Sequence, residues 1–395
     1  MRILLATESS LPYLSGVTVS VDAQARALGA RGHEVLVLAP RPSDGQDPQP
    51  VGSPGPAPRY AWLPSYQLPF GAPAGYRMPV PLPWTEAMAE ATQFRPGIVH
   101  AHSPFVTGLL ARRLSRAARA PLVFTHHTRF ADYGHYLGPL AGPGARAADA
   151  YLAAFWVACA AIVAPSTDLA DEIRGRLPIE RRGRVHVIPT GVDVGGVQAL
   201  QPNDLRADAG WPADAVIVAS LGRLAPEKSP MDVLEAVALS EQPRLHLVIV
   251  GSGPSEDELR RRAAAPDLAG RVRFTGGLPR PEALATIAGA DLFAFASRTE
   301  TQGLVLAEAL SAGLPAVAID GPGVRDSVRD GVDGVVVADR PAENRARRMA
   351  TALSEVASDD DRRAGMAARA REDAVRFSLD RRVDELESLY RSLIA

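Results

Sequence analysis

The feature that most constrains the fold is a regular alternation of short apolar segments with longer segments of helical periodicity. Strands that are apolar along their whole length, and that alternate with helices, form a parallel sheet covered on both faces. The segments Val17–Ala30, Phe105–Ala118 and Thr167–Arg176 have the helical pattern. In the first half of the chain we expect strands at Arg2–Thr7, Glu34–Ala39, Ile98–Ala101, Leu122–Thr125, Ala161–Ala164 and Val185–Ile188.

The alternation restarts after the segment Pro189–Asp193, which indicates a second domain. A chain of 395 residues is long enough for two or three domains at ~150 residues each. We therefore predict two doubly wound α/β domains, residues 1–190 and 191–377, with a helix at about 378–395 that returns to the first. In the second half the expected strands are Val216–Leu221, Leu245–Val250, Val272–Phe274, Leu292–Phe295 and Ala316–Ile319.

Two segments rich in proline interrupt the alternation. Pro40–Pro58 is also rich in Gly, Ser and Asp, which excludes a helix or a central strand and predicts a mobile loop. Tyr60–Trp84 carries six aromatic side chains and therefore has apolar surface to bury. Two interpretations of it stay open: an irregular loop packed on the first domain, or the lip of a binding site or a membrane-contacting surface.

Composition and charge exclude several classes of function. With 43 Lys plus Arg against 45 Asp plus Glu, the net charge is -2, so no overall basic field exists to hold nucleic acid. The single cysteine, Cys159, excludes an intramolecular disulfide and a metal site made of several cysteines. The apolar run at the N-terminus is too short for a signal peptide, so we expect a cytoplasmic protein. The uncharged stretch Ala150–Thr167 is interpreted as a buried helix leading into a strand, not as a membrane span.

The residues that follow the strands of the second half carry the clearest chemical signal. In open α/β sheets ligands bind beyond the carboxyl ends of the strands. Arg223 and Lys228 follow the strand that ends at Leu221, and Lys228 is the only lysine among the 43 basic residues. This local positive charge suits a diphosphate. Gly251 and Gly253 follow the next strand, where glycine allows the backbone to approach closely.

A second constellation follows the strand that ends at Phe295. Glu300 lies at or before the start of a helix and Glu308 is eight residues later, so both carboxylates can lie on one side of that helix. Carboxylates accept hydrogen bonds from hydroxyls, and a helix N-terminus binds phosphate, so together with Arg223 they predict a nucleotide-sugar site. The alternative is a helix cap at Glu300 and a solvated Glu308. The helix-start amides would come from Thr301, Gln302, Gly303 and Leu304.

The first half of the chain also places polar groups at strand ends. Gly16 and Val17 open a helix after the first strand, so their amides could face a phosphate. Five of the eight histidines lie at or just beyond strand ends: His100, His102, His126, His127 and His135. A zinc site is conceivable there, but hydrogen bonding in a polar cleft explains these histidines better. The run Asp359–Asp361 is interpreted as a solvated helix end, not as a metal-diphosphate clamp.

In combination, these motifs resemble the retaining glycosyltransferases of the GT-B fold, family 4. The resemblance rests on Gly222-Arg223-x-x-x-Glu227-Lys228 with Glu300-x(7)-Glu308, and extends over nearly the whole chain. Within the family, the sequence is similar to the branch that glycosylates diacylglycerol through three segments: Glu8–Val17, Thr125–Tyr136 and Thr299–Val305. The resemblance implies two Rossmann-like domains facing across a cleft, and transfer of glucose from UDP-glucose to a diacylglycerol-type lipid in glycolipid synthesis.

The resemblance also implies a role for each matching residue. Arg223 and Lys228 would bind the donor diphosphate, and Glu308 the ribose hydroxyls. Glu300 would contact the transferred sugar, Gly16 the phosphate, and His127 the reacting sugar near the acceptor. No metal or cofactor is required, because the two cations stabilise the leaving diphosphate. Acceptor-side candidates are Tyr13, Asp132, Tyr133, His135 and Tyr136.

The sequence departs from the family pattern at two places. Ser15-Gly16 replaces a pair of glycines. Thr301-Gln302 replaces a Gly or Ser followed by Phe, and this second departure leaves the sugar preference open.

The segment Leu109–Arg119 has apolar and arginine positions at helical spacing. This pattern is typical of a helix on an anionic membrane surface, and also of an ordinary helix packed on the sheet. A different acceptor and a non-catalytic nucleotide-sugar sensor remain as alternatives. A dinucleotide oxidoreductase is disfavoured because no G-x-G-x-x-G follows the first strand.

Overall fold

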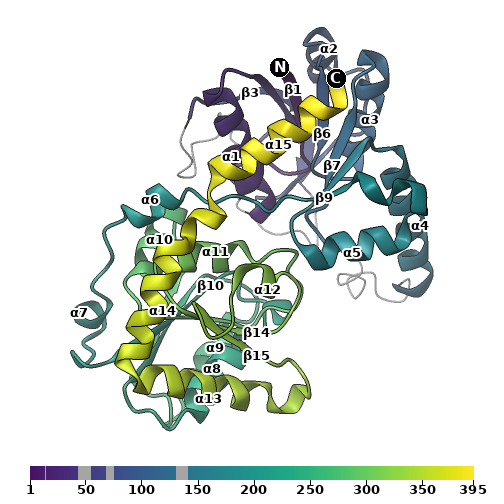
Figure 1. Ribbon diagram of the computed structural model, residues 1–395. Helices are drawn as coiled ribbons and strands as arrows, with labels where there is room; N and C mark the ends of the chain where they lie inside the picture. The colour runs from purple at the N-terminus through teal and green to yellow at the C-terminus, as the bar shows by residue number, and fades with distance from the viewer. Residues whose placement is uncertain (14, 43–54, 68–74, 130–140) are drawn as a thin grey trace. The chain divides into compact units, whose positions relative to one another are not determined.

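Two all-parallel sheets form the framework of the chain (Figure 1). The computed structural model describes residues 1–13, 15–42, 55–67, 75–129 and 141–395. It divides into unit 1, which contains Met1–Gly191 and Leu379–Ala395, and unit 2, which contains Val192–Ser378. Each unit has its own sheet and its own hydrophobic core.

The sheet of unit 1 has the strand order β3-β2-β1-β6-β7-β8-β9. Its neighbouring strands pair in parallel, as expected from strands that are apolar throughout. The bounds are β1 Arg2–Ala6, β2 Glu34–Pro40, β3 Arg59–Leu63, β6 Ile98–Ala101, β7 Leu122–Thr125, β8 Ala161–Ala164 and β9 Val185–Val187.

Helices cover both faces of the unit 1 sheet, because successive side chains of a strand point to opposite faces. In β1, Ile3 and Leu5 face the helices α1 and α15, whereas Leu4 and Ala6 belong to the core under α2 to α5. Helix α15 lies beside α1 (Figure 1). The bounds are α1 Gly16–Ala30, α2 Glu86–Gln93, α3 Val106–Ala118, α4 Ala141–Ala158, α5 Thr167–Arg176 and α15 Leu379–Ile394.

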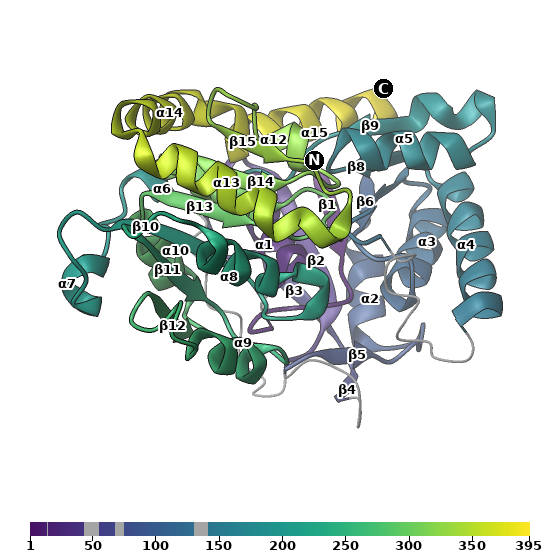
Figure 2. The same cartoon turned by 90° about the horizontal axis from the view of Figure 1, so that it is seen from below.

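The sheet of unit 2 has the order β12-β11-β10-β13-β14-β15, again all parallel. On one face α8 and α13 lie side by side over Val218 and Leu247 (Figure 2). The strands are β10 Val216–Leu221, β11 Leu245–Val250, β12 Val272–Gly276, β13 Leu292–Phe295, β14 Ala316–Ile319 and β15 Gly334–Val337. The helices are α6 Val194–Gln198, α7 Leu205–Ala209, α8 Pro230–Leu239, α9 Glu256–Ala263, α10 Arg280–Ala288, α11 Leu304–Ser311, α12 Val324–Ser327, α13 Arg345–Ser358 and α14 Asp360–Glu372.

Both strand orders confirm the predicted doubly wound topology. In each sheet the order reverses once, between β1 and β6 in unit 1 and between β10 and β13 in unit 2. Ligands of open α/β sheets bind at such a reversal, outside the carboxyl ends of the strands. The loop after β10 begins at Gly222 and the loop after β13 begins at Ala296, so the charged motifs of the sequence start at the reversal of unit 2.

The prediction of an irregular segment at Tyr60–Trp84 is wrong in part. Residues Arg59–Leu63 form β3, which extends the parallel sheet beyond β2. The short strands β4, Ser65–Gln67, and β5, Arg77–Pro79, pair as an antiparallel ribbon. Tyr60 and Trp62 stack face to face and are packed against the core under α1. Residues 68–74 lie outside the described part of the chain.

Two further strand predictions need correction. Pro40, the first residue of the segment expected to be a mobile loop, is the last residue of β2. Residues 43–54 of that segment lie outside the described part of the chain. Strand β15 was not predicted from the sequence; it forms the edge of its sheet, paired with β14.

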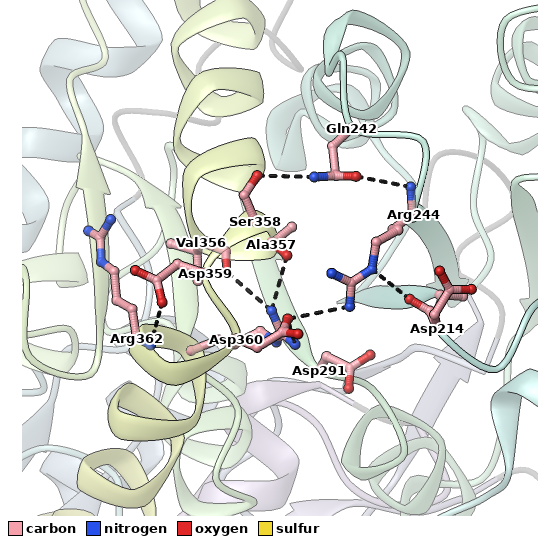
Figure 3. Close-up of polar contacts among 12 residues, drawn as sticks. Asp214, Gln242, Arg244, Asp291, Val356, Ala357, Ser358, Asp359, Asp360 and Arg362 are labelled. Atoms are coloured by element: carbon pink, nitrogen blue, oxygen red, sulfur yellow. Dashed lines mark hydrogen bonds and ion pairs between the residues drawn. The ribbon is translucent and has the colours of Figure 1, made fainter.

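The run Asp359–Asp361 marks the junction of α13 and α14, as the sequence suggested (Figure 3). The Asp359 side chain caps α14 by accepting the backbone N–H of Arg362 at 2.9 Å. Asp360 accepts from Arg363 at 2.7 Å and pairs with Arg244 at 3.3 Å. These two guanidinium groups lower the pKa of the Asp360 carboxyl, and the contact with Arg363 has the larger effect. The structure therefore assigns Asp359 to helix capping and Asp360 to surface ion pairs.

Candidate functional site

In unit 2, the loop after β10 places Arg223 and Lys228 beside carboxylates. Gly222 has φ 154°, in the region that favours glycine, and begins the turn away from the strand. Arg223 pairs with Glu227, which is buried. Lys228 ends a single turn of 3-10 helix, Pro226–Lys228, and its ammonium pairs with Glu300 from the loop after β13. The loops on the two sides of the strand-order reversal are thus joined by an ion pair.

Glu300 does not lie on the helix that carries Glu308. Helix α11 begins at Leu304, with Gly303 as its cap in a left-handed conformation, so Glu300 belongs to the preceding loop. Glu300 thus lies before the helix start, one of the two positions expected for it, and helical spacing does not determine how its carboxylate lies relative to that of Glu308. In the same loop the hydroxyls of Ser297 and Thr299 are buried and have no hydrogen-bond partner in the described part of the chain.

Glu308 is buried and its carboxylate pairs with Arg280, the first residue of α10. Burial raises the pKa of Glu308, and the Arg280 guanidinium acts in the opposite direction. Among the described residues, Oε2 of Glu308 has no hydrogen-bond partner. The interpretation of Glu308 as a solvated surface residue is thus wrong.

Arg280 is a site residue that the sequence analysis missed. It follows the strand β12 after the segment Gly277–Pro279, so it lies at the same carboxyl edge of the sheet as Gly222 and Ser297. That position is the signal that could have revealed it. Arg298 adds another cation to this edge and donates to the Ser229 hydroxyl at 3.3 Å.

Gly251 and Gly253 are required by the contact between two neighbouring loops. A Cβ on Gly251 would lie 1.9 Å from the carbonyl oxygen of Gly222, and one on Gly253 would lie 2.4 Å from that of Leu224. The Leu224 amide donates to the carbonyl of Ser252 at 2.9 Å. The absence of a side chain at these two glycines therefore lets the loops after β10 and β11 touch each other.

In unit 1, Gly16 and Val17 form the first turn of α1. Ser15 precedes them as the helix cap: its hydroxyl accepts the Thr18 amide at 3.2 Å, and the Thr18 hydroxyl accepts the Ser15 amide at 2.8 Å. Serine at this position therefore stabilises the helix start. Gly16 is exposed, with open space where a Cβ would stand. The ring of Tyr13 packs edge-on against Tyr76.

Four histidines gather at the ends of β6 and β7. Nδ1 of His102 lies 2.9 Å from Nε2 of His127, and the His102 ring also stacks on His100. Burial lowers the pKa of His100 to about 3, of His126 to about 3 and of His127 to about 4, and lowers that of His102 well below its usual value. These imidazoles are therefore neutral at physiological pH. Among the residues that the structure describes, no group of three or more His, Cys, Asp or Glu side chains is arranged to hold a metal ion.

The remaining candidates of unit 1 are the acceptor-side residues and helix α3. The acceptor-side candidates Asp132, Tyr133, His135 and Tyr136 lie outside the described residues. Helix α3 packs on the sheet through Leu110 and Leu114, and exposes Leu109, Arg113 and Arg116. Within the described ranges, no helix is both long and apolar enough to cross a membrane.

Comparisons with known proteins agree with the topology. The family model described as Glycosyltransferase Family 4 matches residues 14–195, and the model described as Glycosyl transferases group 1 matches residues 202–373. An alpha-monoglucosyldiacylglycerol synthase of Streptococcus pneumoniae is 29% identical over 85% of this chain and 75% of its own length. A GDP-mannose-dependent alpha-mannosyltransferase of Mycolicibacterium smegmatis is 32% identical over 83% of this chain and 82% of its own length.

A solved structure is similar in fold to this chain. The crystal structure of HepE from Anabaena, in complex with UDP and glucose, superposes with a TM-score of 0.72 and 21% identity, and the match covers 100% of both chains. At this identity the likeness concerns the fold.

Proposed function

Since the chain belongs to glycosyltransferase family 4 and has the GT-B fold, we propose that it transfers glucose from UDP-glucose to a diacylglycerol-type lipid with retention at the anomeric carbon. Glycosyltransferase activity follows from the family. The lipid acceptor and the glucose donor are suggested by the alpha-monoglucosyldiacylglycerol synthase of S. pneumoniae, and by the three sequence segments similar to that branch.

The observation that carries the proposal is the set of ion pairs at the strand-order reversal of unit 2. Lys228 pairs with Glu300, and Arg280 pairs with the buried Glu308. A nucleotide sugar offers phosphate oxygens to cations and hydroxyl protons to carboxylates, so it suits both members of each pair. Oε2 of Glu308, which has no hydrogen-bond partner among the described residues, is the acceptor we assign to a ribose hydroxyl.

In the proposed mechanism the protein positions the two substrates and stabilises the leaving group. The bond between the anomeric carbon and the diphosphate oxygen breaks, and the bond to the acceptor oxygen forms on the same face of the sugar. The acceptor proton passes to the departing phosphate oxygen. Arg223 and Lys228 neutralise the charge that develops on the diphosphate, so we propose that no metal ion is needed. Glu300 holds sugar hydroxyls, and the loops at Gly251 and Thr301–Leu304 border the nucleotide.

Unit 1 supplies the acceptor side in this proposal. The Gly16 and Val17 amides belong to the first turn of α1, whose N–H groups have no carbonyl partner within the helix, and they bind phosphate. His127, at the end of β7, contacts the reacting sugar. Tyr13 borders the acceptor. These assignments rest on the match of each residue to the family motif.

We propose that the exposed side of α3 contacts anionic membrane lipid at the inner face of the cell membrane. Leu109 is exposed beside Arg113 and Arg116, whereas Leu110 and Leu114 are buried against the sheet. An apolar side chain flanked by guanidinium groups suits an anionic surface. Arg113→Gln with Arg116→Gln should reduce co-sedimentation with phosphatidylglycerol vesicles. The matched control, Arg347→Gln with Arg369→Gln in unit 2, removes two exposed arginines and should not; equal loss in both would refute the surface.

The experiment that tests the reaction is product analysis by mass spectrometry. The purified protein is incubated with UDP-glucose, UDP-galactose, UDP-N-acetylglucosamine or GDP-mannose, each with and without diacylglycerol vesicles. We expect a hexosyl-diacylglycerol from UDP-glucose, lost in Lys228→Ala and retained in Arg261→Ala, an exposed arginine of α9.

Other outcomes lead to the alternatives. Turnover of GDP-mannose in place of UDP-glucose would favour a mannosyltransferase, as the M. smegmatis relative suggests. Release of nucleoside diphosphate without glycolipid would move the acceptor to another lipid, a sugar or a small metabolite. Tight donor binding without turnover or hydrolysis would make the protein a nucleotide-sugar sensor.

A further inference from the structure

A buried series of hydrogen bonds and one stacked ring pair leads from helix α15 toward His127 in unit 1. The Tyr390 hydroxyl lies 2.6 Å from Nδ1 of His100, whose Nε2 lies 2.7 Å from the Thr125 hydroxyl. The His100 ring stacks on His102 with 4.3 Å between centroids, and Nδ1 of His102 lies 2.9 Å from Nε2 of His127. Each imidazole has a fixed orientation in this chain, so the position of each proton can be worked out.

The proton positions are determined at the Tyr390 end. Burial raises the pKa of Tyr390 well above its usual value, so its hydroxyl keeps its proton. The Gln24 amide nitrogen lies 3.1 Å from the same hydroxyl and donates to it, so the hydroxyl donates to Nδ1 of His100. His100 is then protonated at Nε2, where it donates to Thr125.

A neutral His102 can carry its proton on either ring nitrogen, and the burial of its Nε2 atom decides between these two tautomers. The facing nitrogens of His102 and His127 hold one proton between them, because both rings are neutral. Nε2 of His102 is buried and has no hydrogen-bond partner among the described residues. If it carried the proton, a buried N–H would be left without an acceptor, and such orphan donors are rare in folded proteins. The proton is therefore on Nδ1 of His102.

We propose that His102 is a positioning residue that fixes His127 as its Nδ1-protonated tautomer, by donating its own Nδ1–H to Nε2 of His127. This inference deepens the proposed function and rests on it for the role of His127. With its Nε2 lone pair occupied, His127 cannot take a proton from the acceptor there; it can only donate from Nδ1. Within the proposed function, the polar proton that His127 carries is therefore the one on Nδ1, and removal of the acceptor proton is left to the departing phosphate.

Nuclear magnetic resonance of the full chain labelled with ¹⁵N-histidine tests the tautomer directly. Long-range couplings from the ring nitrogens to the carbon-bound ring protons distinguish protonated from unprotonated nitrogen, and the His127 signals are identified by their loss in His127→Asn. At pH 7.5 we expect His127 to be protonated at Nδ1 and unprotonated at Nε2. The opposite assignment in the wild-type protein would overturn the proposal, and this readout needs no variant of His102.

Variants of His102 link the tautomer to activity. Asparagine places an amide nitrogen at the same distance from Cβ as Nδ1, so His102→Asn should keep the His127 tautomer and most of kcat. His102→Leu removes the donor, so the Nδ1-protonated fraction of His127 should fall and kcat should drop about tenfold, with KM for the donor unchanged. Equal kcat in the two variants would refute the positioning role.

A control separates positioning from general damage to the buried chain. Tyr390→Phe breaks the hydrogen bond to His100 at the far end and leaves the contact between His102 and His127 in place. It should lower stability without changing the His127 tautomer or kcat. If the wild-type protein turns over none of the donors, the proposed function fails, while the tautomer measurement still decides the inference about His102.

Discussion

At the scale of single residues, the buried carboxylate of Glu308 depends on one guanidinium. Its side chain is 1% exposed and that of Arg280 is 22% exposed, so solvent reaches the pair only from the arginine side. A carboxylate out of water is costly unless it is paired, because its charge loses hydration that only a close cation replaces. Arg280 therefore stabilises the folded protein as well as the proposed donor site.

Replacing Arg280 by glutamine should show that the buried Glu308 carboxylate depends on this guanidinium. Arg280→Gln leaves Glu308 buried without its cation, and we expect a loss of about 2 to 3 kcal/mol in the free energy of unfolding at neutral pH. The pKa of Glu308, already raised by burial, should rise further. A raised folded pKa gives stability that is lost as pH rises, so the deficit should be smaller at pH 5 than at pH 7.5. Thermal or urea unfolding at both pH values measures it, and a deficit independent of pH contradicts the argument.

The neutral histidines of unit 1 should make the protein sensitive to acid. Burial lowers the pKa of His100 to about 3, below the usual 6.5, so the unfolded chain binds protons there that the folded chain does not. Stability is then full above pH 6.5 and falls as pH decreases toward 3, by about 1.4 kcal/mol per pH unit for each such histidine. His100→Gln should flatten the curve of unfolding free energy against pH by that slope. Parallel curves for the wild type and the variant would refute this prediction.

At the scale of elements, helix α3 depends on a side chain from another strand end for its cap. Its own cap residue, Phe105, makes no side-chain hydrogen bond. Instead the Glu8 carboxylate, just after β1, accepts the Val106 amide at 3.2 Å, the Thr107 amide at 3.1 Å and the Thr107 hydroxyl at 2.7 Å. A negative charge at a helix N-terminus is favourable, so Glu8 ties α3 to the reversal of strand order between β1 and β6.

Removing the charge of Glu8 should therefore loosen α3. Glu8→Gln keeps the size of the side chain but loses the charge and one acceptor oxygen, and we expect about 1 to 2 kcal/mol of destabilisation. Glu86→Gln is the matched control, because Glu86 is exposed in the first turn of α2 while Thr85 supplies that cap. The control should cost less than about 0.5 kcal/mol. Equal effects in urea unfolding would show that Glu8 does not cap α3.

The sequence predicted elements well where one residue pattern decides them. Strands such as Ala316–Ile319 are buried on both faces, so every position is apolar and the pattern is unambiguous. Strand β3 was not predicted because it lies at the sheet edge, has prolines close by in the sequence, and buries only some of its side chains. The helix that carries Glu308 was predicted, but its start was placed too early, since the left-handed cap at Gly303 depends on local backbone geometry.

The sequence predicted those residues of the candidate site that directly follow a strand, but not the contacts between distant parts of the chain. Arg223, Lys228, Glu300 and Glu308 all follow strands whose carboxyl ends meet at the reversal of order, and the structure joins Lys228 to Glu300. Arg280 was missed because its role comes from a pairing with Glu308, 28 residues further on, which no local pattern specifies. Likewise, the contact between His102 and His127 depends on the pairing of β6 with β7.

At the scale of the whole molecule, the chain passes from unit 1 to unit 2 after Gly191 and returns after Ser378, and the two passages touch. A Cβ on Gly191 would lie 2.4 Å from Cα of Leu379, where α15 begins. On the unit 2 side, the Val192 amide donates to the Phe377 carbonyl at 2.7 Å. Glycine at position 191 therefore lets the start of α15 sit against the outgoing chain, so that Val383 and Leu386 cover the sheet of unit 1.

Gly191→Ala should consequently weaken the attachment of α15. The added methyl group meets backbone atoms, which move less easily than a flexible side chain, so we expect about 1 to 3 kcal/mol of destabilisation. Gly175→Ala is the control: that glycine lies in α5 with nothing within 4 Å of its Cβ position, so alanine should be neutral or stabilise by up to about 1 kcal/mol. Hydrogen exchange should increase along α15 in Gly191→Ala alone, because the helix opens before the rest of unit 1. If exchange rises equally in α15 and α5, the strain is not local and the close approach at Gly191 does not hold α15 in place.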